Sequence, residues 1–423
     1  MPADPLRGLP AACSVPAGCV DVGTQDNRHD QTNGRCSTVE FGESEELRSL
    51  RDMVRRFGER EIAPFVDEWD RTETFPKELN KKYAELGLLG GVMDPAYGGS
   101  GMSFVEETVV MEELAYFSTM AAMVCGQPTH SLGTGLAHYG SEALKEKYLR
   151  PTLQGDMVGA VAVTEGHSGS NIVRTMETTA RRDGDDYVLN GAKVWVSNMT
   201  NADWILTFAT IDKSRAHKGV CAFVLDKHSA GVSEHPYKDK VGARTFASGE
   251  LALDDVRVPA ENLIGVEGEG YKVLMAGTEI GRLACAARAV GQLRAVLDLS
   301  RTYAQEREVA GTEIGRYQLI QEKIAMMAVD LEAGSLLTFK LAWLADQRDR
   351  RLQKEAAIAK LYTTDALMRG ADQAMRLFGA SSCMPEYKIG RLWRDAKFMQ
   401  IYDGTNEIQT VIIAEHELGY RRA

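Results

Sequence analysis

Apolar residues recur along the chain with two different periods, and the points where the period changes divide it into blocks. From Ser44 onward they recur near helical spacing among charged residues, at Leu47, Leu50, Val54, Phe57 and Ile62. Similar patterns cover residues 76–90, 106–117 and 141–153, with a glycine-rich loop at 96–101 between them. We therefore expect the first block to be all-helical to about residue 157.

The second block consists of short β-rich segments separated by turn residues. These segments are 157–165, 185–198, 203–211, 219–227 and 248–259. A run of strands without intervening helices predicts an antiparallel sheet or barrel, because a doubly wound fold would alternate strands with helices. Asn190-Gly191 is typical of a hairpin turn, so we expect the chain to reverse there.

From Gly270 the chain becomes helical again. The segments near 271–306, 317–346, 351–379 and 405–419 are rich in Ala and Leu and largely free of Pro, which predicts an antiparallel four-helix bundle. The fold class is therefore α+β, with a helical domain (41–157), a middle antiparallel β-barrel-like domain (158–265) and a C-terminal bundle (266–423). Residues 1–40 are rich in Gly, Pro and polar residues, and we expect a disordered or loosely attached extension.

Composition narrows the function classes. The net charge of −11 disfavours a nucleic-acid surface, which needs clustered Lys and Arg. The seven cysteines form no CxxC pair and join no histidine cluster, so neither a metal site nor a disulfide framework is indicated. No apolar run is long enough to span a bilayer, and residues 1–20 lack the basic segment of a signal peptide. We expect a cytoplasmic protein with no membrane or nucleic-acid partner.

Three short stretches could carry chemistry. In IYDGTNEIQ (401–409), Asp403 is either a proton-abstracting carboxylate or part of a turn, since Asp-Gly is itself a strong turn signal. The loop TEGHSGSN (164–171) follows a strand and could offer donors to a phosphate or a flavin. In KVWVSN (193–198), strand alternation puts Trp195 and Ser197 on one face. The glycine spacing at 265–273 lacks the β-α context of a dinucleotide fingerprint.

The order of these pieces resembles the acyl-CoA dehydrogenase family of flavoproteins, from about residue 44 to 420. The strongest part is D-A-K-x-x-Q-I-Y-D-G-T-N-E-I-Q (395–409), supported by VTEGHSGSN, NGAKVWVSN, the 249–271 segment and EIGRLACAARAVG (279–291). The resemblance implies FAD between the middle and last domains, reaching a neighbouring subunit of a homotetramer or homodimer. It also implies an acyl thioester substrate and, as a possible electron acceptor, an electron-transfer flavoprotein.

The resemblance assigns roles to individual residues. Asp403 matches the catalytic carboxylate. The expected FAD contacts are Val163, Thr164, Gly169, Ser170, Trp195, Ser197, Arg307, Gln318, Arg376, Gly379, Thr405 and Glu407. The expected substrate contacts are Glu279, Arg282, Tyr402 and Gly404. Arg307 and Gln318 match contacts that cross between subunits.

The sequence also departs from the family pattern. The usual residue at position 403 is Glu, and the position from which some members supply a relocated glutamate is Gly281. Either Asp403 acts on a thioester despite its shorter reach, or another group is the base. Alternatively, the enzyme could be a flavin oxidase or monooxygenase of the nitroalkane-oxidising type, although that branch has an arginine where Thr410 stands.

Two further readings stay open. The chain could be a non-catalytic family member in which Asp403 only caps a helix. Met120, Met123 and Val124 are candidates for lining a substrate pocket, but core packing is the more common role for such residues.

Overall fold

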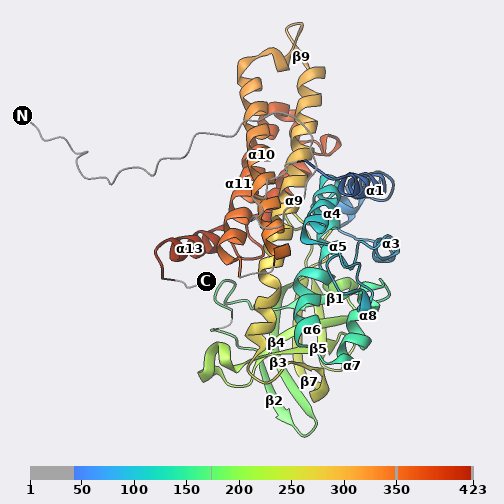
Figure 1. Ribbon diagram of the computed structural model, residues 1–423, viewed down its shortest axis with the longest axis vertical. Helices are drawn as coiled ribbons and strands as arrows, with labels where there is room; N and C mark the ends of the chain where they lie inside the picture. Colours follow the sequence, from blue (N-terminus) through green and yellow to red (C-terminus); the bar gives the residue numbers. More distant parts are fainter. Residues whose placement is uncertain (1–41, 173, 348–350, 421–423) are drawn as a thin grey trace, which may run out of the picture. The chain divides into compact units, whose positions relative to one another are not determined.

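The structure is a computed structural model that describes residues 42–172, 174–347 and 351–420. The extension expected at 1–40 lies outside these residues. From Ser44 onward the chain forms one compact unit of helices and a sheet (Figure 1). No helix in the described part of the chain combines the length and apolar character needed to cross a bilayer.

The first block is helical, as its periodicity predicts. Its helices are α1 (Glu45–Glu61), α2 (Val66–Thr72), α3 (Leu79–Glu85), α4 (Phe104–Phe117), α5 (Thr119–Gly126), α6 (Thr134–Tyr139), α7 (Glu142–Leu144) and α8 (Arg150–Leu153). Side chains fix where the longer ones begin: Ser44 caps α1, and Ser103 with Glu106 forms a capping box at α4. A π-helix at Pro128–Gly133 joins α5 to α6.

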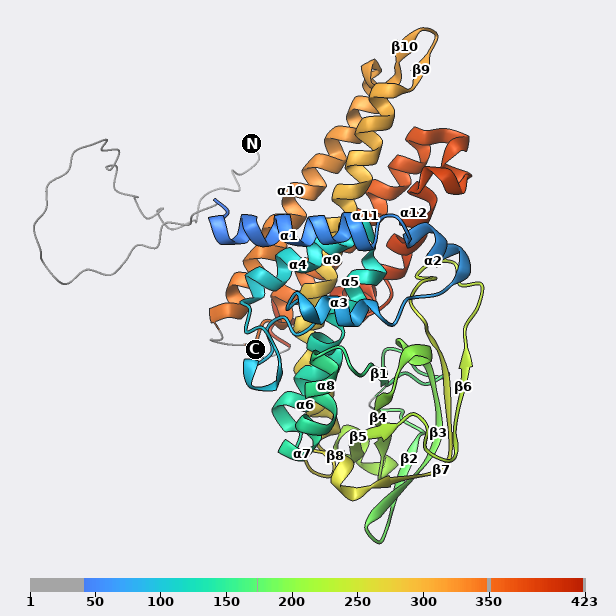
Figure 2. The ribbon, with the colours of Figure 1, turned by 90° about the vertical axis from the view of Figure 1, so that its right-hand side faces the viewer.

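The middle block is one sheet with the strand order β6-β7-β3-β2-β4-β5-β8, and β1 also pairs with β4 (Figure 2). Its strands are β1 (Gly159–Ala162), β2 (Thr179–Asp183), β3 (Asp186–Val196), β4 (Trp204–Thr210), β5 (Val220–Asp226), β6 (Val232–Pro236), β7 (Gly249–Pro259) and β8 (Leu263–Ile264). Most pairings are antiparallel, but β1–β4 and β2–β4 are parallel. Every residue of β4 is buried, so this strand is the centre of the sheet.

The expected hairpin turn at Asn190-Gly191 is wrong. Both residues lie inside β3, where the register against β7 shifts between Leu189 and Gly191. Gly191 has φ 148°, and a Cβ there would lie 2.7 Å from Thr178 Cα, so the glycine serves a bulge with close backbone approach. The chain actually reverses one strand length earlier, at Gly184 between β2 and β3.

The last block is built on three long helices, α9 (Gly270–Glu306), α10 (Gln318–Gln347) and α11 (Gln353–Phe378). A small hairpin, β9 (Glu308–Val309) with β10 (Thr312–Glu313), joins α9 to α10. Two shorter helices pack on α11, namely α12 (Ile389–Met399), which periodicity did not separate, and α13 (Asn406–Glu417). At Gly291 a Cβ would lie 2.0 Å from the carbonyl oxygen of Glu112, so α9 and α4 are in close backbone contact.

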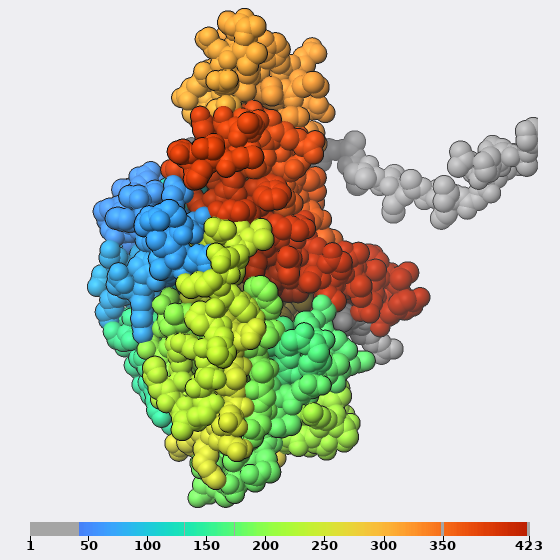
Figure 3. All heavy atoms as spheres, turned by 180° about the vertical axis from the view of Figure 1, so that it is seen from behind, coloured from blue at the N-terminus to red at the C-terminus, as the bar shows by residue number. Residues whose placement is uncertain are grey.

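The segment between β6 and β7 ties the sheet to both helical blocks. Figure 3 shows it, in yellow-green, between the blue N-terminal helices and the red C-terminal ones. The amide of Asp239 donates to Glu73 at 3.1 Å, and the amide of Ala243 donates to Asp395 of α12 at 2.8 Å. The sheet is therefore anchored through this segment at two points.

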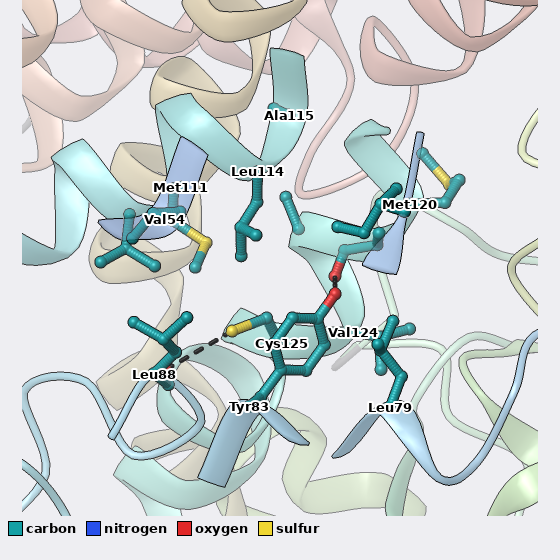
Figure 4. Packing of buried hydrophobic residues seen from close by; sticks show 14 of the residues in the cluster. Val54, Leu79, Tyr83, Leu88, Met111, Leu114, Ala115, Met120, Val124 and Cys125 are labelled. Carbon is teal, nitrogen blue, oxygen red and sulfur yellow. Dashed lines mark hydrogen bonds between the residues drawn. The ribbon is translucent and has the colours of Figure 1, made fainter. Parts of the chain in front are cut away.

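The first helical block has its own apolar core (Figure 4). Met120 and Val124 lie in this core with Tyr83, whose hydroxyl donates to the carbonyl of Ala121 at 3.2 Å. Met123 packs against the same cluster while partly buried. Core packing therefore accounts for the residues that the sequence offered as pocket candidates.

A buried carboxylate joins three helices of this fold. Glu113 of α4 is fully buried and pairs with Arg51 and Arg55 of α1 and with Arg294 of α9, the last at 2.7 Å. A carboxylate in such a place is stable only while its cations remain. Glu113 thus fixes α1 and α9 against α4.

We predict that Glu113→Ala lowers the free energy of unfolding by about 3–5 kcal/mol, because three arginines lose the buried carboxylate that holds them together. Urea denaturation measures the change. Glu146→Ala is the matched control, since Glu146 pairs with Arg150 on the exposed surface. An equal effect of the two substitutions would contradict this role of Glu113.

Candidate active site

Asp403 lies in the turn between α12 and α13 and faces α9. A Cβ built on Gly281 of α9 would lie 3.8 Å from each atom of the Asp403 carboxyl group. Asp403 itself has φ 54°, and its side chain is 34% exposed. The two positions from which a base could come, 281 and 403, therefore face the same point in space.

The alternative that Asp403 caps a helix is wrong. The N-cap of α13 is Thr405, whose hydroxyl accepts from the amide of Ile408. Because Thr405 satisfies the start of the helix, the carboxylate of Asp403 is left to point toward α9. A left-handed backbone at a non-glycine residue is uncommon and is often found at functional sites.

A buried lysine holds this turn in place. Lys360 of α11 is fully buried. Its ammonium donates to the carbonyls of Gln400 (3.3 Å) and Gly404 (3.0 Å) and to the amide oxygen of Asn406 (2.7 Å). Burial lowers the pKa of Lys360, while the neighbouring Cys285 and Asp403 oppose this effect. The side-chain amide of Gln409 also donates to two backbone carbonyls of the turn, those of Asp403 (3.3 Å) and Gly404 (2.8 Å).

Sequence reasoning missed a second buried cation beside Asp403. Arg288 of α9 is two turns beyond Gly281, and its Nη2 lies 3.7 Å from Oδ2 of Asp403. Its guanidinium also lies over the ring of Tyr402, 5.8 Å from the ring centroid. The available signal was an arginine inside the small, apolar run LACAARAVG, where nothing else is charged.

The expected substrate contacts lie around the same turn. Arg282 is beside it, with Nη2 3.8 Å from the position of a Cβ on Gly404. Burial raises the pKa of the Tyr402 phenol well above its ordinary value, so the ring is a neutral wall. Glu279 instead accepts from the amide of Leu352 at 3.0 Å, at the start of α11. Its role toward a substrate stays a prediction.

Most of the expected flavin contacts in the sheet come together. The amide of Val194 donates to the carbonyl of Thr164 at 2.9 Å, and Ser197 pairs with Val161. Gly169 and Ser170 are exposed on the adjoining loop, and Val163 packs against the apolar core beneath it. These neighbouring edges therefore present the loop donors and Ser197 side by side.

The exposure of the Trp195 ring bears on whether these residues fit a flat cofactor. Its side chain is 53% exposed and its φ is 56°, an outlier for a bulky residue. The one ring recorded against the indole among the described residues is that of Tyr237, at 4.7 Å. An exposed aromatic surface held in this way fits an isoalloxazine ring.

The flavin loop is fixed from below by a buried ion pair. Glu165 accepts from Lys193 at 2.7 Å and from the amides of Glu177 and Thr178 at 2.6 and 3.0 Å. Burial lowers the pKa of Lys193 to about 8, against the opposing effect of Glu165. The pair joins the loop to β3, so the loop donors keep their place relative to Trp195.

The remaining FAD candidates lie far from this group. Arg307 ends α9 and follows Gly281 by 26 residues, which is roughly 39 Å along one helix. Gln318 begins α10 beyond the β9–β10 hairpin, at the end of α9 opposite the sheet (Figure 1). The end of α11 carries Arg376, which pairs with Asp372, and Gly379. This end packs near Tyr303, which lies close to the C-terminal end of α9. One chain does not bring these residues to Asp403. Thr405 and Glu407, by contrast, lie directly after it.

Three family models cover almost the whole described chain. The N-terminal, middle and C-terminal domains of acyl-CoA dehydrogenase match residues 44–156, 160–256 and 268–418. A curated relative, glutaryl-CoA dehydrogenase of Desulfococcus multivorans, is 35% identical over 91% of this chain and 100% of its own length.

Solved structures agree with these models. A glutaryl-coenzyme A dehydrogenase in complex with glutaryl-CoA superposes with a TM-score of 0.87 at 36% identity, covering 91% of this chain and 98% of that one. A glutaryl-CoA dehydrogenase from Mycobacterium smegmatis in complex with FADH2 superposes with a TM-score of 0.84 at 29% identity, covering 89% and 95%.

The buried carboxyl group of Asp395 makes the free energy of unfolding depend on pH. Burial raises its pKa to about 6, although Arg391 opposes the effect. The folded chain therefore holds a proton between about pH 4 and pH 6 that the unfolded chain releases. The resulting stabilisation is present at low pH and is lost as the pH rises through about 6.

We predict that Asp395→Asn removes this dependence, because the amide can still accept from Ala243. Relative to the unsubstituted chain, the variant should gain about 3 kcal/mol in free energy of unfolding between pH 4 and pH 7. Urea titrations at several pH values measure the difference, with the exposed Asp52→Asn as control. A difference that does not change with pH would contradict the assignment.

Proposed function

The chain belongs to the acyl-CoA dehydrogenase family, and on this premise we propose that it oxidises an acyl thioester with bound FAD, using Asp403 as the base. The assignment of the base rests on the position of the Asp403 carboxyl group, which lies 3.8 Å from a Cβ built on Gly281. Asp403 also has no capping role, because Thr405 is the N-cap of α13. On this proposal, aspartate takes the role that the family resemblance gives to glutamate.

The chain's own residues would act as follows. Thr164, Ser170, Trp195 and Ser197 would hold FAD, which when bound accepts a hydride from the β carbon of the substrate. Arg282 and Gly404 would seat the thioester against Asp403, whose carboxylate takes the α proton. Lys360 keeps the turn rigid, and this rigidity matters because small misplacements of a base are costly to the rate.

An open pocket on the sheet is suited to the anionic part of a coenzyme A thioester. Its volume is about 530 Å³, and Arg181, Arg182 and Lys213 are among the residues that line it. Glu267, also in its wall, precedes the start of α9, which runs for roughly 16 Å before reaching Gly281. An extended phosphopantetheine-type arm could cover this interval.

We also propose that the active form is a homotetramer or homodimer. Arg307 and Gln318 could serve only a cofactor bound largely by another copy, since they end helices far from Asp403. In addition, α10 exposes a stripe of apolar side chains at three- and seven-residue spacing: Leu319, Met326, Val329, Leu336 and Trp343. Such a stripe is the pattern of a helix that packs against a partner helix.

A second candidate function is a flavin oxidase of the nitroalkane type, for which an electron-transfer flavoprotein would not be needed. The observation in its favour is Arg288, which puts an arginine beside Asp403 where the sequence offered only Thr410. Reduction by nitroalkanes alone, with rapid reoxidation in air, would favour this candidate.

We predict that anaerobic mixing with a panel of acyl-CoA thioesters bleaches the flavin, and that Asp403→Asn slows bleaching by about 10³-fold through loss of the base. Asp403→Glu should retain bleaching, and the exposed Asp254→Asn should not affect it. Flavin absorbance in a stopped-flow instrument measures the rate. Bleaching that is unchanged in Asp403→Asn would contradict the assignment, and a purified chain without flavin absorbance would support a non-catalytic protein.

We predict that Val329→Glu, which places a charge in the apolar stripe, converts the assembly to single chains and lowers flavin content several-fold. Light scattering after size-exclusion chromatography measures the mass. Leu86→Glu is the control, since Leu86 is an exposed apolar residue far from α10 in sequence. An unchanged mass for Val329→Glu would show that α10 is not the interface.

A further inference from the structure

The buried carboxylate of Glu107 on α4 has fewer partners than other buried acids of the fold. Its side chain is 5% exposed, and the one ion-pair partner recorded for it among the described residues is His130, whose Nε2 lies 3.2 Å from Oε1. Glu113 and Glu165, by contrast, contact arginines, a lysine or backbone amides. A single imidazole replaces little of the water that a buried carboxylate loses.

Glu107 and His130 line a narrow cavity between α4, the π-helix and α9. The cavity has about 160 Å³ of empty space, and the rest of its lining is Thr108, Met111, Ile280, Leu283 and Ala284. The Thr108 hydroxyl is buried without a hydrogen-bond partner, whereas that of Thr338 donates to the carbonyl four residues earlier. The cavity is too narrow for a water molecule, so a group can enter only where the unbranched side chain of Met111 moves aside.

This cavity adjoins the place where the proposed substrate would lie. Ala284, in its wall, follows Gly281 by three residues and is therefore its neighbour on the surface of α9. On the other side, Gln127 directly precedes the π-helix, and its side-chain amide donates to the carbonyl of Ser197 at 3.4 Å. His130 is thus held between the edge proposed for the flavin and the helix that faces the base.

The pair of Glu107 and His130 suits a hydroxyl group better than a charged group. A carboxylate accepts from a hydroxyl and an imidazole N–H donates to one, so a single hydroxyl can engage both side chains. A second carboxylate would be repelled by Glu107, and an ammonium group would be repelled by His130 whenever the imidazole is protonated. A neutral group that both donates and accepts therefore fits this cavity.

We propose that Glu107 and His130 bind a hydroxyl group on the acyl chain, so that the substrate is the thioester of a hydroxy acid. The inference rests on the function proposed above. The α carbon must approach Asp403 to about 3–3.5 Å, and Gly281 and Ala284 are separated by roughly 5 Å, or about four covalent bonds. This separation places the hydroxyl at the end of an acyl chain of about five or six carbons.

The test compares coenzyme A thioesters matched in chain length: ω-hydroxypentanoyl against pentanoyl, and ω-hydroxyhexanoyl against hexanoyl. The enzyme with its flavin is mixed anaerobically with each, and the second-order rate constant of flavin bleaching is measured. We expect the hydroxylated member of at least one pair to react at least about 100-fold faster, because a site built to hydrogen-bond a hydroxyl rejects the analogue that lacks it.

Two variants locate the preference. Glu107→Leu combined with His130→Leu should lower the ratio of the two rate constants by about 100-fold, because both proposed partners of the hydroxyl are removed together. Glu107→Gln should keep part of the ratio, since an amide oxygen can still accept from the hydroxyl. The matched control is Glu142→Leu combined with His138→Leu, because both residues are exposed, and its ratio should not change.

Other outcomes overturn the inference. If neither hydroxylated thioester reacts faster than its partner in the unsubstituted enzyme, the inference fails without any variant. An equal loss for both members of a pair in the double variant would show that Glu107 and His130 only support the fold. Bleaching by the unhydroxylated thioesters alone would leave the proposed function standing while this inference falls, and no bleaching by any thioester would remove both.

Discussion

The geometry of the site depends on one buried ammonium group. Lys360 reaches from α11 to three oxygen atoms of the turn between α12 and α13, and the turn carries Asp403. Without it, each of these oxygens would lose its charged donor and keep only neutral ones, from Asn406, Gln409 and Thr364. Lys360 therefore supports the turn that holds Asp403 opposite Gly281.

Buried charges perform comparable tasks elsewhere in the chain. Glu113 fixes α1 and α9 on α4, and Glu165 with Lys193 fixes the loop beside Trp195. In each case a buried carboxylate lies within ion-pair distance of the cation that faces it. Arg288 belongs to the same group, because its Nη2 lies 3.7 Å from Asp403 and its side chain is buried.

Sequence patterns predicted much of the fold, because elements such as α1 and β7 bury one face with regular spacing. The failure at Asn190-Gly191 has a physical reason: the dipeptide suits any backbone with positive φ, and in β3 a bulge uses it instead of a turn. The family resemblance supplied Asp403 and the residues around Trp195. It did not supply Lys360 or Arg288, since the partners of a buried cation come from segments about 40 to over 100 residues away. Nor could the sequence show that Arg307 ends the same helix that faces Asp403 at Gly281, 26 residues earlier.

The unbroken course of α9 has a consequence for any assembly of these chains. The first half of the helix lies opposite Asp403, and its C-terminal end carries Arg307, for which we propose a contact with a neighbour's cofactor. A stiff rod of roughly 55 Å transmits a tilt at one end to the other. If two catalytic centres were joined by such helices, they would be mechanically coupled. A ligand that shifts α9 beside one Asp403 would then also move Arg307 at the neighbouring centre.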